Sequence, residues 1–317
     1  MPSLARPEVI LTHESDLDGL VSGLLLQRVA QRIFEVDVDV EAYNYQGWKN
    51  RALRENVAWV SDFAFEPRMD RSGWLVLDHH TSNFAPKIAH LVHDSQKSAA
   101  RLCYDLAQAH GLGSLALDRI VHLTNLGDLF LEDDPDFALA CDYASLVKTY
   151  GFWNLHQILG GKLETLLDHP LLEVMSTKRR VEDPIGFSMA VKNVVELSPT
   201  VATVRPPVGN SNLIVHRLLN HNEMRFRVLA TIFRKGAGNF VVSFRSRHGE
   251  ALAVAQKFEG GGGHRNASGA TLPRGIASYE DALEYLRLRL NVPVQTASEQ
   301  ADEARLNAAF MSLKWPA

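Results

Sequence analysis

Short apolar runs in the first 80 residues constrain the fold of this chain more than any other feature of the sequence. Three of them, EVILTH (8–13), VAWVSD (57–62) and WLVLDH (74–79), lack the alternation of apolar and polar residues that marks a strand with one solvated face. Strands of this kind are typical of parallel sheets that helices cover on both faces. A fourth run, VDVDVEAY (36–43), is also predicted to form a strand.

Helix-like segments connect these runs. Residues 18–34 (DGLVSGLLLQRVAQRIF) carry apolar side chains at helical spacing, and residues 98–111 predict a second helix with Ser98 as its N-cap. A strand, a helix and a strand in succession make a βαβ unit. The pattern predicts an α/β fold, in which an N-terminal domain has a doubly wound, mostly parallel sheet and faces a smaller α/β C-terminal domain across a cleft.

Each of the three apolar runs ends in side chains that can bind metal ions. The strand ends carry His13 with Asp16 and Asp18, then Asp62, and then Asp78, His79 and His80. Loops at the carboxyl edge of an open parallel sheet converge on one crevice, so we expect these side chains to meet. Buried carboxylates cannot gather without cations, because like charges and desolvation would force protonation.

The donor types indicate which cations these are. Histidine and aspartate without thiolate suit Mn²⁺ or Mg²⁺, and the imidazoles favour Mn²⁺. The candidate donors outnumber those that one ion needs, so two ions that share a bridging carboxylate are the economical arrangement.

Composition places the chain among soluble globular proteins. It has 317 residues, 46% apolar and 22% charged, which is enough for two domains of ordinary size. It has no run of 18 apolar residues, and Glu8 leaves no room for a signal-peptide core, so we expect a cytoplasmic protein. Cys103 and Cys141 lack the spacing of a zinc site and are interpreted as reduced core residues.

The net charge of −4 conceals a basic segment. Between residues 185 and 275 the chain has 12 Lys and Arg residues against 4 Asp and Glu residues. The glycine-rich sequence FEGGGGHRNASGA (258–270) lies there with Arg245 and Arg247, and glycines let several backbone N–H groups approach an anion. An acidic part suited to cations and a basic part suited to anions are therefore expected.

Proline-rich LSPTVATVRPPVGNSN, residues 197–212, is the best candidate for a linker between the two parts. We predict a metal-binding catalytic domain over residues 1–196 and a substrate-binding domain over residues 213–317.

Six motifs resemble those of the DHH phosphoesterase superfamily with its DHH-associated C-terminal domain, in particular the nano-RNase and RecJ branches. They are THESDLDGLVSG, VSDFAF, LDHHTSN, NLGDLF, the Arg-Ser pair at 245–246, and GGGH at 261–264. The resemblance spans residues 8–272. It implies a dinuclear Mn²⁺ site, with Mg²⁺ as the alternative, that activates a water for attack on a phosphoester.

The resemblance also assigns residues. It implies that His13, Asp16 and Asp62 hold one ion and that Asp18, Asp62, His79 and Asp128 hold the other. Asp62 is then the bridge, His80 contacts the substrate phosphate, and Asp78 supports the site or handles protons. Asp128 lies in a helix-like segment that we expect to be interrupted at Gly127. The expected substrate-binding residues are Arg245, Ser246, Gly261, Gly262, Gly263 and His264, with the neighbouring Arg265.

Short substrates fit the sequence better than long ones. A single-strand exonuclease needs a basic channel with stacking aromatics, whereas this chain carries −4 overall and 8% aromatic residues. We predict an oligoribonuclease-like enzyme that acts on di- to tetranucleotides, linearised cyclic dinucleotides or 3′,5′-bisphosphate nucleotides, without a membrane partner. The alternatives are a RecJ-like single-strand exonuclease and a non-catalytic nucleotide-sensing protein. A homodimer is compatible with the sequence.

Overall fold

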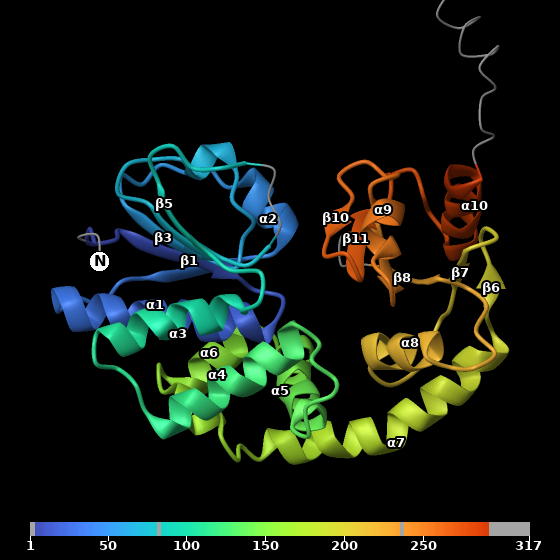
Figure 1. The fold of residues 1–317 in the computed structure, drawn as a ribbon, viewed down its shortest axis with the longest axis horizontal. Coiled ribbons are helices and arrows are strands. Elements are labelled where there is room, and N and C mark those ends of the chain that lie inside the picture. Colours follow the sequence, from blue (N-terminus) through green and yellow to red (C-terminus); the bar gives the residue numbers. More distant parts are fainter. Residues whose placement is uncertain (1–3, 81–83, 235–237, 292–317) are drawn as a thin grey trace, which may run out of the picture. The chain divides into compact units, whose positions relative to one another are not determined.

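A computed structural model describes residues 4–80, 84–234 and 238–291 of the chain. The chain divides into two compact units, which Figure 1 shows in ribbon form. The first unit comprises residues 1–192 and 206–217, and the second comprises residues 193–205 and 218–317. Among the described residues, no helix has the length and apolar character needed to traverse a bilayer.

A five-stranded, all-parallel sheet forms the centre of the first unit. Its strands are β1 (Val9–His13), β2 (Val40–Tyr43), β3 (Ala58–Ser61), β4 (Leu75–Asp78) and β5 (His90–His93). Their order is β2-β1-β3-β4-β5, so the winding direction reverses between β1 and β3. The predicted doubly wound α/β fold is confirmed, and ligands bind such folds at the reversal point. Strand β5 was not predicted, because its two histidines interrupt any apolar run.

Alternate residues of the strands fill two separate cores. Ile10, Trp59 and Leu77 belong to the core on the side of α1 (Leu17–Phe34) and α3 (Ala99–Ala109). Their strand neighbours, such as Leu11 and Val60, pack on the other side with Trp48 of α2 (Tyr45–Asn50). Figure 1 shows α1 and α3 together along one side of the sheet. Burial on both faces explains why the runs lack alternation.

Further helices extend the first unit beyond α1 and α3 (Figure 1). Helix α4 packs on α1 and α3, and α5 packs on α4 and α7. The elements are the 3₁₀ turn η1 (Pro67–Met69), α4 (Leu115–Asp128), α5 (Phe137–Tyr150), α6 (Phe152–Leu159), the 3₁₀ turn η2 (Leu163–Leu166) and α7 (Leu171–Lys192).

A six-stranded mixed sheet forms the second unit, in the order β10-β11-β9-β8-β7-β6. Among the described residues, β7 and β8 form the one parallel pair of neighbouring strands in this sheet, and the other pairs are antiparallel. Helices α9 and α10 add apolar side chains to its core. The elements are β6 (Val195–Glu196), β7 (Val201–Thr203), β8 (Val228–Arg234), β9 (Phe240–Ser246), α9 (Glu250–Ala255), β10 (Gly262–Gly263), β11 (Ala267–Thr271) and α10 (Tyr279–Leu290).

The segment 197–212 differs from the linker that its prolines suggested. It supplies β7 to the second sheet and the start of helix α8 (Ser211–Leu219). Residues 206–217 return to the first unit, so the chain passes between the units more than once. Strand β7 has 3 residues, too few to produce a periodic pattern in the sequence.

Candidate metal centre

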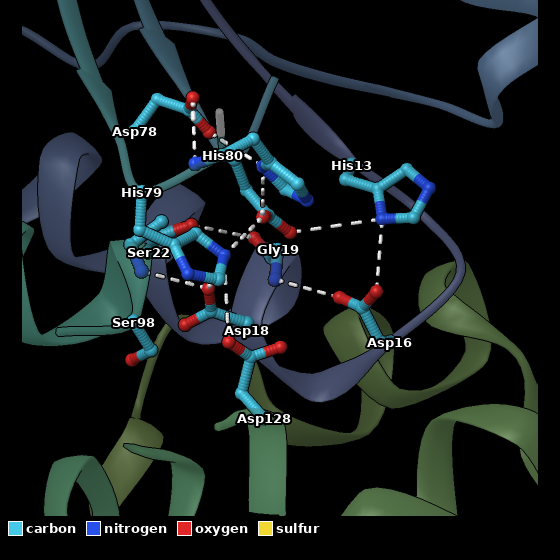
Figure 2. A network of polar contacts seen from close by, with 12 residues as sticks. His13, Asp16, Asp18, Gly19, Ser22, Asp78, His79, His80, Ser98 and Asp128 are labelled. Carbon is cyan, nitrogen blue, oxygen red and sulfur yellow. Dashed lines mark hydrogen bonds and ion pairs between the residues drawn. The ribbon is translucent and has the colours of Figure 1, made fainter. Parts of the chain in front are cut away.

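The loop between β1 and α1 carries the first two candidate ligands. His13 is the last residue of β1, and Asp16 is the N-cap of α1, where its Oδ1 accepts a hydrogen bond from the Gly19 N–H at 3.1 Å. The other carboxylate oxygen of Asp16 lies 2.9 Å from His13 Nδ1. Asp16 therefore caps the helix with one oxygen and directs the other toward His13, as Figure 2 shows.

Gly19 allows α1 to begin this close to β1. A Cβ atom at this position would lie 1.9 Å from the backbone oxygen of His13. Because that atom belongs to the backbone, no rotation of a side chain could relieve the clash. The position after Asp18 therefore requires glycine for steric reasons. It keeps His13 and Asp18 at the same edge of the sheet.

Asp62 lies between His13, which ends β1, and His79, which follows β4. It directly follows β3, its side chain is 3% exposed, and its φ of 60° is in the left-handed region that non-glycine residues rarely adopt. Its Oδ2 is 3.6 Å from His13 Nδ1, and its Oδ1 is 3.6 Å from His79 Nε2. Both distances exceed a hydrogen bond, and Oδ2 has no hydrogen-bond partner among the described residues. A carboxylate placed in this way suits a bridging ligand.

The DHH triplet separates into different directions at the end of β4. Asp78 is buried, and its Oδ1 lies 2.7 Å from His80 Nδ1 while its Oδ2 accepts the His80 backbone N–H at 3.0 Å. His79 points instead toward the carboxylates of Asp18, Asp62 and Asp128 (Figure 2). Asp78 thus orients His80, and His79 joins the carboxylate group.

Asp18 and Asp128 face His79 from two helices. His79 Nε2 lies 3.8 Å from Asp18 Oδ2 and 3.4 Å from Asp128 Oδ2. The interruption expected at Gly127 is wrong, because α4 is continuous through Asp128. A Cβ atom at Gly127 would lie 3.3 Å from the backbone oxygen of Ala140, so this glycine lets α5 pack closely on α4. Asp128 reaches the site from the last turn of an unbroken helix.

Two overlapping groups of metal-binding side chains result. One contains His13, Asp16 and Asp62, and the other contains Asp18, Asp62 and His79; within each group the donor atoms lie within 4.8 Å of one another. Among the described residues, the ion-pair partners of these carboxylates are histidines, with no Lys or Arg. An oxygen-rich donor set with imidazole and without thiolate fits two divalent cations such as Mn²⁺ or Mg²⁺.

Crowding of the carboxylates is reflected in their pKa values. Burial, followed by the charge of Asp62, raises the pKa of Asp18 to about 7. Burial, followed by the charge of Asp18, raises the pKa of Asp128 well above its usual range. Burial alone would also raise the pKa of Asp62, but the imidazoles of His13 and His79 hold it well below its usual range. A divalent cation would offset the repulsion that raises the pKa values of Asp18 and Asp128.

The pKa values of the three histidines are also raised, but by neighbouring charge and not by burial. Burial alone would lower their pKa values, but neighbouring carboxylates outweigh it. Asp16 raises the pKa of His13 well above its usual value. Asp62 raises the pKa of His79 to about 9, and Asp78 raises the pKa of His80 to about 9. Before a cation binds, the site therefore holds its protons on imidazoles and carboxyls together.

Three buried hydroxyls next to the site were not identified from the sequence. Ser22 Oγ donates to Ser61 Oγ at 2.9 Å, Ser61 Oγ donates to Thr12 Oγ1 at 3.0 Å, and Thr12 Oγ1 donates to the Gly19 backbone oxygen at 2.7 Å. This chain of hydrogen bonds joins β1, β3 and α1. Its one signal in the sequence is that Thr12 and Ser61 each precede a candidate ligand directly.

In the second unit, Arg245 and Ser246 end strand β9. Arg245 Nε is buried and has no hydrogen-bond partner among the described residues, and burial lowers the pKa of its guanidinium. Ser246 Oγ accepts a hydrogen bond from the Ala251 N–H at the start of α9, at 3.0 Å. Ser246 thus serves the local fold, whereas Arg245 is a cation suited to an incoming anion.

The glycine-rich segment forms a hairpin. Gly262 and Gly263 pair with β11 in antiparallel register, and the Gly261 N–H donates to the Phe258 backbone oxygen at 3.0 Å. The His264 N–H donates to the Ala267 backbone oxygen at 2.8 Å, and Arg265 is exposed. The backbone N–H groups of 261 and 264, expected to be available to an anion, are therefore used within the chain.

No family model matches the chain, and no curated protein matches it in sequence. Among solved structures, the chain is similar to PggH, a pGpG-specific phosphodiesterase from Vibrio cholerae, at 15% identity and a TM-score of 0.52, over 95% of this chain and 99% of that one. The chain has the fold of PggH.

Two other solved structures show weaker likenesses. An exopolyphosphatase-related protein from Bacteroides fragilis aligns at 17% identity and a TM-score of 0.47, over 90% of this chain and 94% of that one. RecJ from Thermus thermophilus, solved with Mg²⁺, aligns at 16% identity and a TM-score of 0.47, over 90% of this chain and 50% of that one. The likeness to PggH is one of fold, and the resemblance to the DHH phosphoesterase superfamily rests on the sequence motifs.

Proposed function

We propose that this chain is a phosphoesterase that uses two divalent metal ions to hydrolyse short nucleotide phosphoesters. The observation that carries the proposal is the pair of donor groups that share Asp62. They lie where the sheet order reverses, between β1 and β3, the position at which folds of this kind bind ligands. The strained backbone of Asp62 supports the proposal, because such strain persists mainly at functional sites.

The candidate site residues have separate proposed roles in binding metal and phosphate. His13, Asp16 and Asp62 would hold one ion, and Asp18, Asp62, His79 and Asp128 would hold the other. When bound, the ions supply Lewis acidity and a hydroxide at neutral pH. His80, oriented by Asp78 and with its pKa raised to about 9, carries a positive charge at neutral pH and binds a non-bridging oxygen of the phosphate.

The metal is proposed to be Mn²⁺, with Mg²⁺ as the alternative, because imidazole ligands favour Mn²⁺. In the second unit, Arg245 is proposed to bind a second phosphate or the terminal phosphate of the substrate, since it is a cation without an ion-pair partner among the described residues. Ser246, Gly261, Gly262, Gly263, His264 and Arg265 are proposed to complete this substrate-binding surface.

The substrate is proposed to be a di- to tetranucleotide or a related small phosphoester. A net charge of −4 and 8% aromatic residues are not typical of a protein that binds long single-stranded nucleic acid along a basic, aromatic track. PggH acts on pGpG, a dinucleotide, which makes that compound the first to test.

Hydrolysis of a substrate panel tests the proposal. The panel contains pGpG, pApA, cyclic di-AMP, pAp and a long single-stranded DNA, each with Mn²⁺ and with EDTA. We expect hydrolysis of pGpG or pApA that requires Mn²⁺, is lost in Asp62→Asn, and persists in Asp37→Asn, whose carboxylate is exposed and lies outside the site. Preference for the long DNA would overturn the substrate assignment, and full activity of Asp62→Asn would overturn the bridged metal pair.

A further inference from the structure

Asp18 is held by a helix to which it does not belong. It lies in the first turn of α1, yet its Oδ2 accepts the N–H of Ala99 at 2.8 Å and its Oδ1 accepts the N–H of Ala100 at 2.7 Å. Both donors belong to the first turn of α3, and the Asp18 side chain is buried. The N-terminus of α3 therefore fixes both carboxylate oxygens of this candidate ligand.

The N-terminus of α3 is itself held by Asn125 of α4. Ser98, the fully buried N-cap of α3, donates its backbone N–H to Asn125 Oδ1 at 2.8 Å. The acceptor must be the amide oxygen, because a backbone N–H can only donate. Asn125 and Asp128 stand three residues apart, on the same side of α4. Helix α4 thus presents Asp128 to His79 directly and reaches Asp18 through Asn125 and α3.

We propose that Asn125 is a positioning residue for the second ion, the one assigned to Asp18, Asp62, His79 and Asp128. This inference rests on the proposed function. Without the amide oxygen, the buried N–H of Ser98 has no acceptor, α3 shifts, and the two N–H groups that fix Asp18 move with it. The first ion has no such connection, because His13 and Asp16 are held by β1 and by the N-terminus of α1.

Calorimetric titration of Mn²⁺ into the EDTA-treated, dialysed protein tests this role without measuring activity. We expect wild type to bind two ions and Asn125→Ala to bind the second about 10- to 100-fold more weakly, with the first unchanged. Asn125→Asp keeps an oxygen in the same place and should restore most of the affinity. Thr124→Val is the matched control, because the buried hydroxyl of this neighbouring residue bonds, among the described residues, only within α4, to the Ile120 backbone oxygen at 2.8 Å.

The outcomes separate this proposal from the proposed function. Wild type that binds fewer than two ions would contradict the proposed function. Wild type that binds two ions while Asn125→Ala also binds both with unchanged affinity would overturn the role of Asn125 alone. Equal weakening of both ions, or the same loss in Thr124→Val, would also overturn it, because either result indicates a general effect on folding.

Discussion

At Asp62, one residue combines a left-handed backbone, a buried carboxylate and proximity to two imidazoles. Asparagine tolerates this backbone conformation better than alanine does, because its side chain can hydrogen-bond locally. We therefore expect the free energy of unfolding of Asp62→Asn to be about 1 kcal/mol larger than that of Asp62→Ala. Urea denaturation of both variants in EDTA measures this difference, and equal values would show that the local backbone relaxes.

Asp78 and His80 act as one unit in the proposed site. Because Asp78 holds His80 by two hydrogen bonds, loss of either residue removes the same contact with the phosphate. We expect Asp78→Asn and His80→Gln each to lower kcat/KM by about 100-fold, and the double variant to lower it no further. Kinetics with saturating Mn²⁺ provide the test. Additive losses would mean that Asp78 has a separate task.

Residues at strand ends were predictable, and those between elements were not. His13, Asp62 and His79 follow or end buried apolar runs, so the parallel-sheet rule was enough to place them together. The hydroxyls of Ser22 and Ser61 come from different elements, and nothing in the linear sequence pairs them. The hydrogen bond between Ser98 and Asn125 is likewise a product of helix packing.

At the scale of elements, the join between β1 and α1 decides whether the site forms. A methyl group at Gly19 would collide with the backbone of His13, which cannot move without breaking β1. We expect Gly19→Ala to lower the free energy of unfolding by about 3 kcal/mol. Thermal and urea unfolding, followed by circular dichroism, measure the loss.

Gly113→Ala is the control for this prediction. A Cβ atom there would meet its nearest neighbour, Gln108 Cγ, at 3.4 Å, which is ordinary contact. Its effect should stay within about 0.5 kcal/mol. A Gly19→Ala variant as stable as this control would show that the close approach of α1 to β1 is not required.

The boundaries of helices and linkers were harder to predict from the sequence than the buried strands. A glycine inside a helical pattern reads as a break, but Gly127 serves the packing of α5 on α4, a contact that the local sequence does not specify. Prolines in 197–212 read as a linker, but the strand between them pairs with β8 through residues far along the chain. Local sequence indicates the conformations that the backbone can adopt, whereas contacts with distant residues decide whether a segment becomes a helix, a strand or a linker.

At the scale of the whole molecule, proton binding links metal affinity to the stability of the fold. In the EDTA-treated protein, the raised pKa of His79 contributes stability that is fully present below its unfolded value, about 6.5, and is lost as the pH passes about 9. The raised pKa of Asp18 acts in the same direction, since its contribution is lost as the pH rises toward about 7. Metal binding needs these groups deprotonated, so it strengthens over the same interval.

We therefore expect the difference in Tm between Mn²⁺-loaded and EDTA-treated protein to widen from about pH 6.5 to about pH 9. Scanning fluorimetry across this range measures it, and Asp62→Asn serves as the control in which the difference should stay small at every pH. A difference that does not change with pH in the wild type would mean that His79 binds no metal. The ions displace the protons that the carboxylates and imidazoles hold in the EDTA-treated protein. Once the difference in Tm is converted into a difference in the free energy of unfolding, its slope with pH therefore reports the number of protons released when the ions bind.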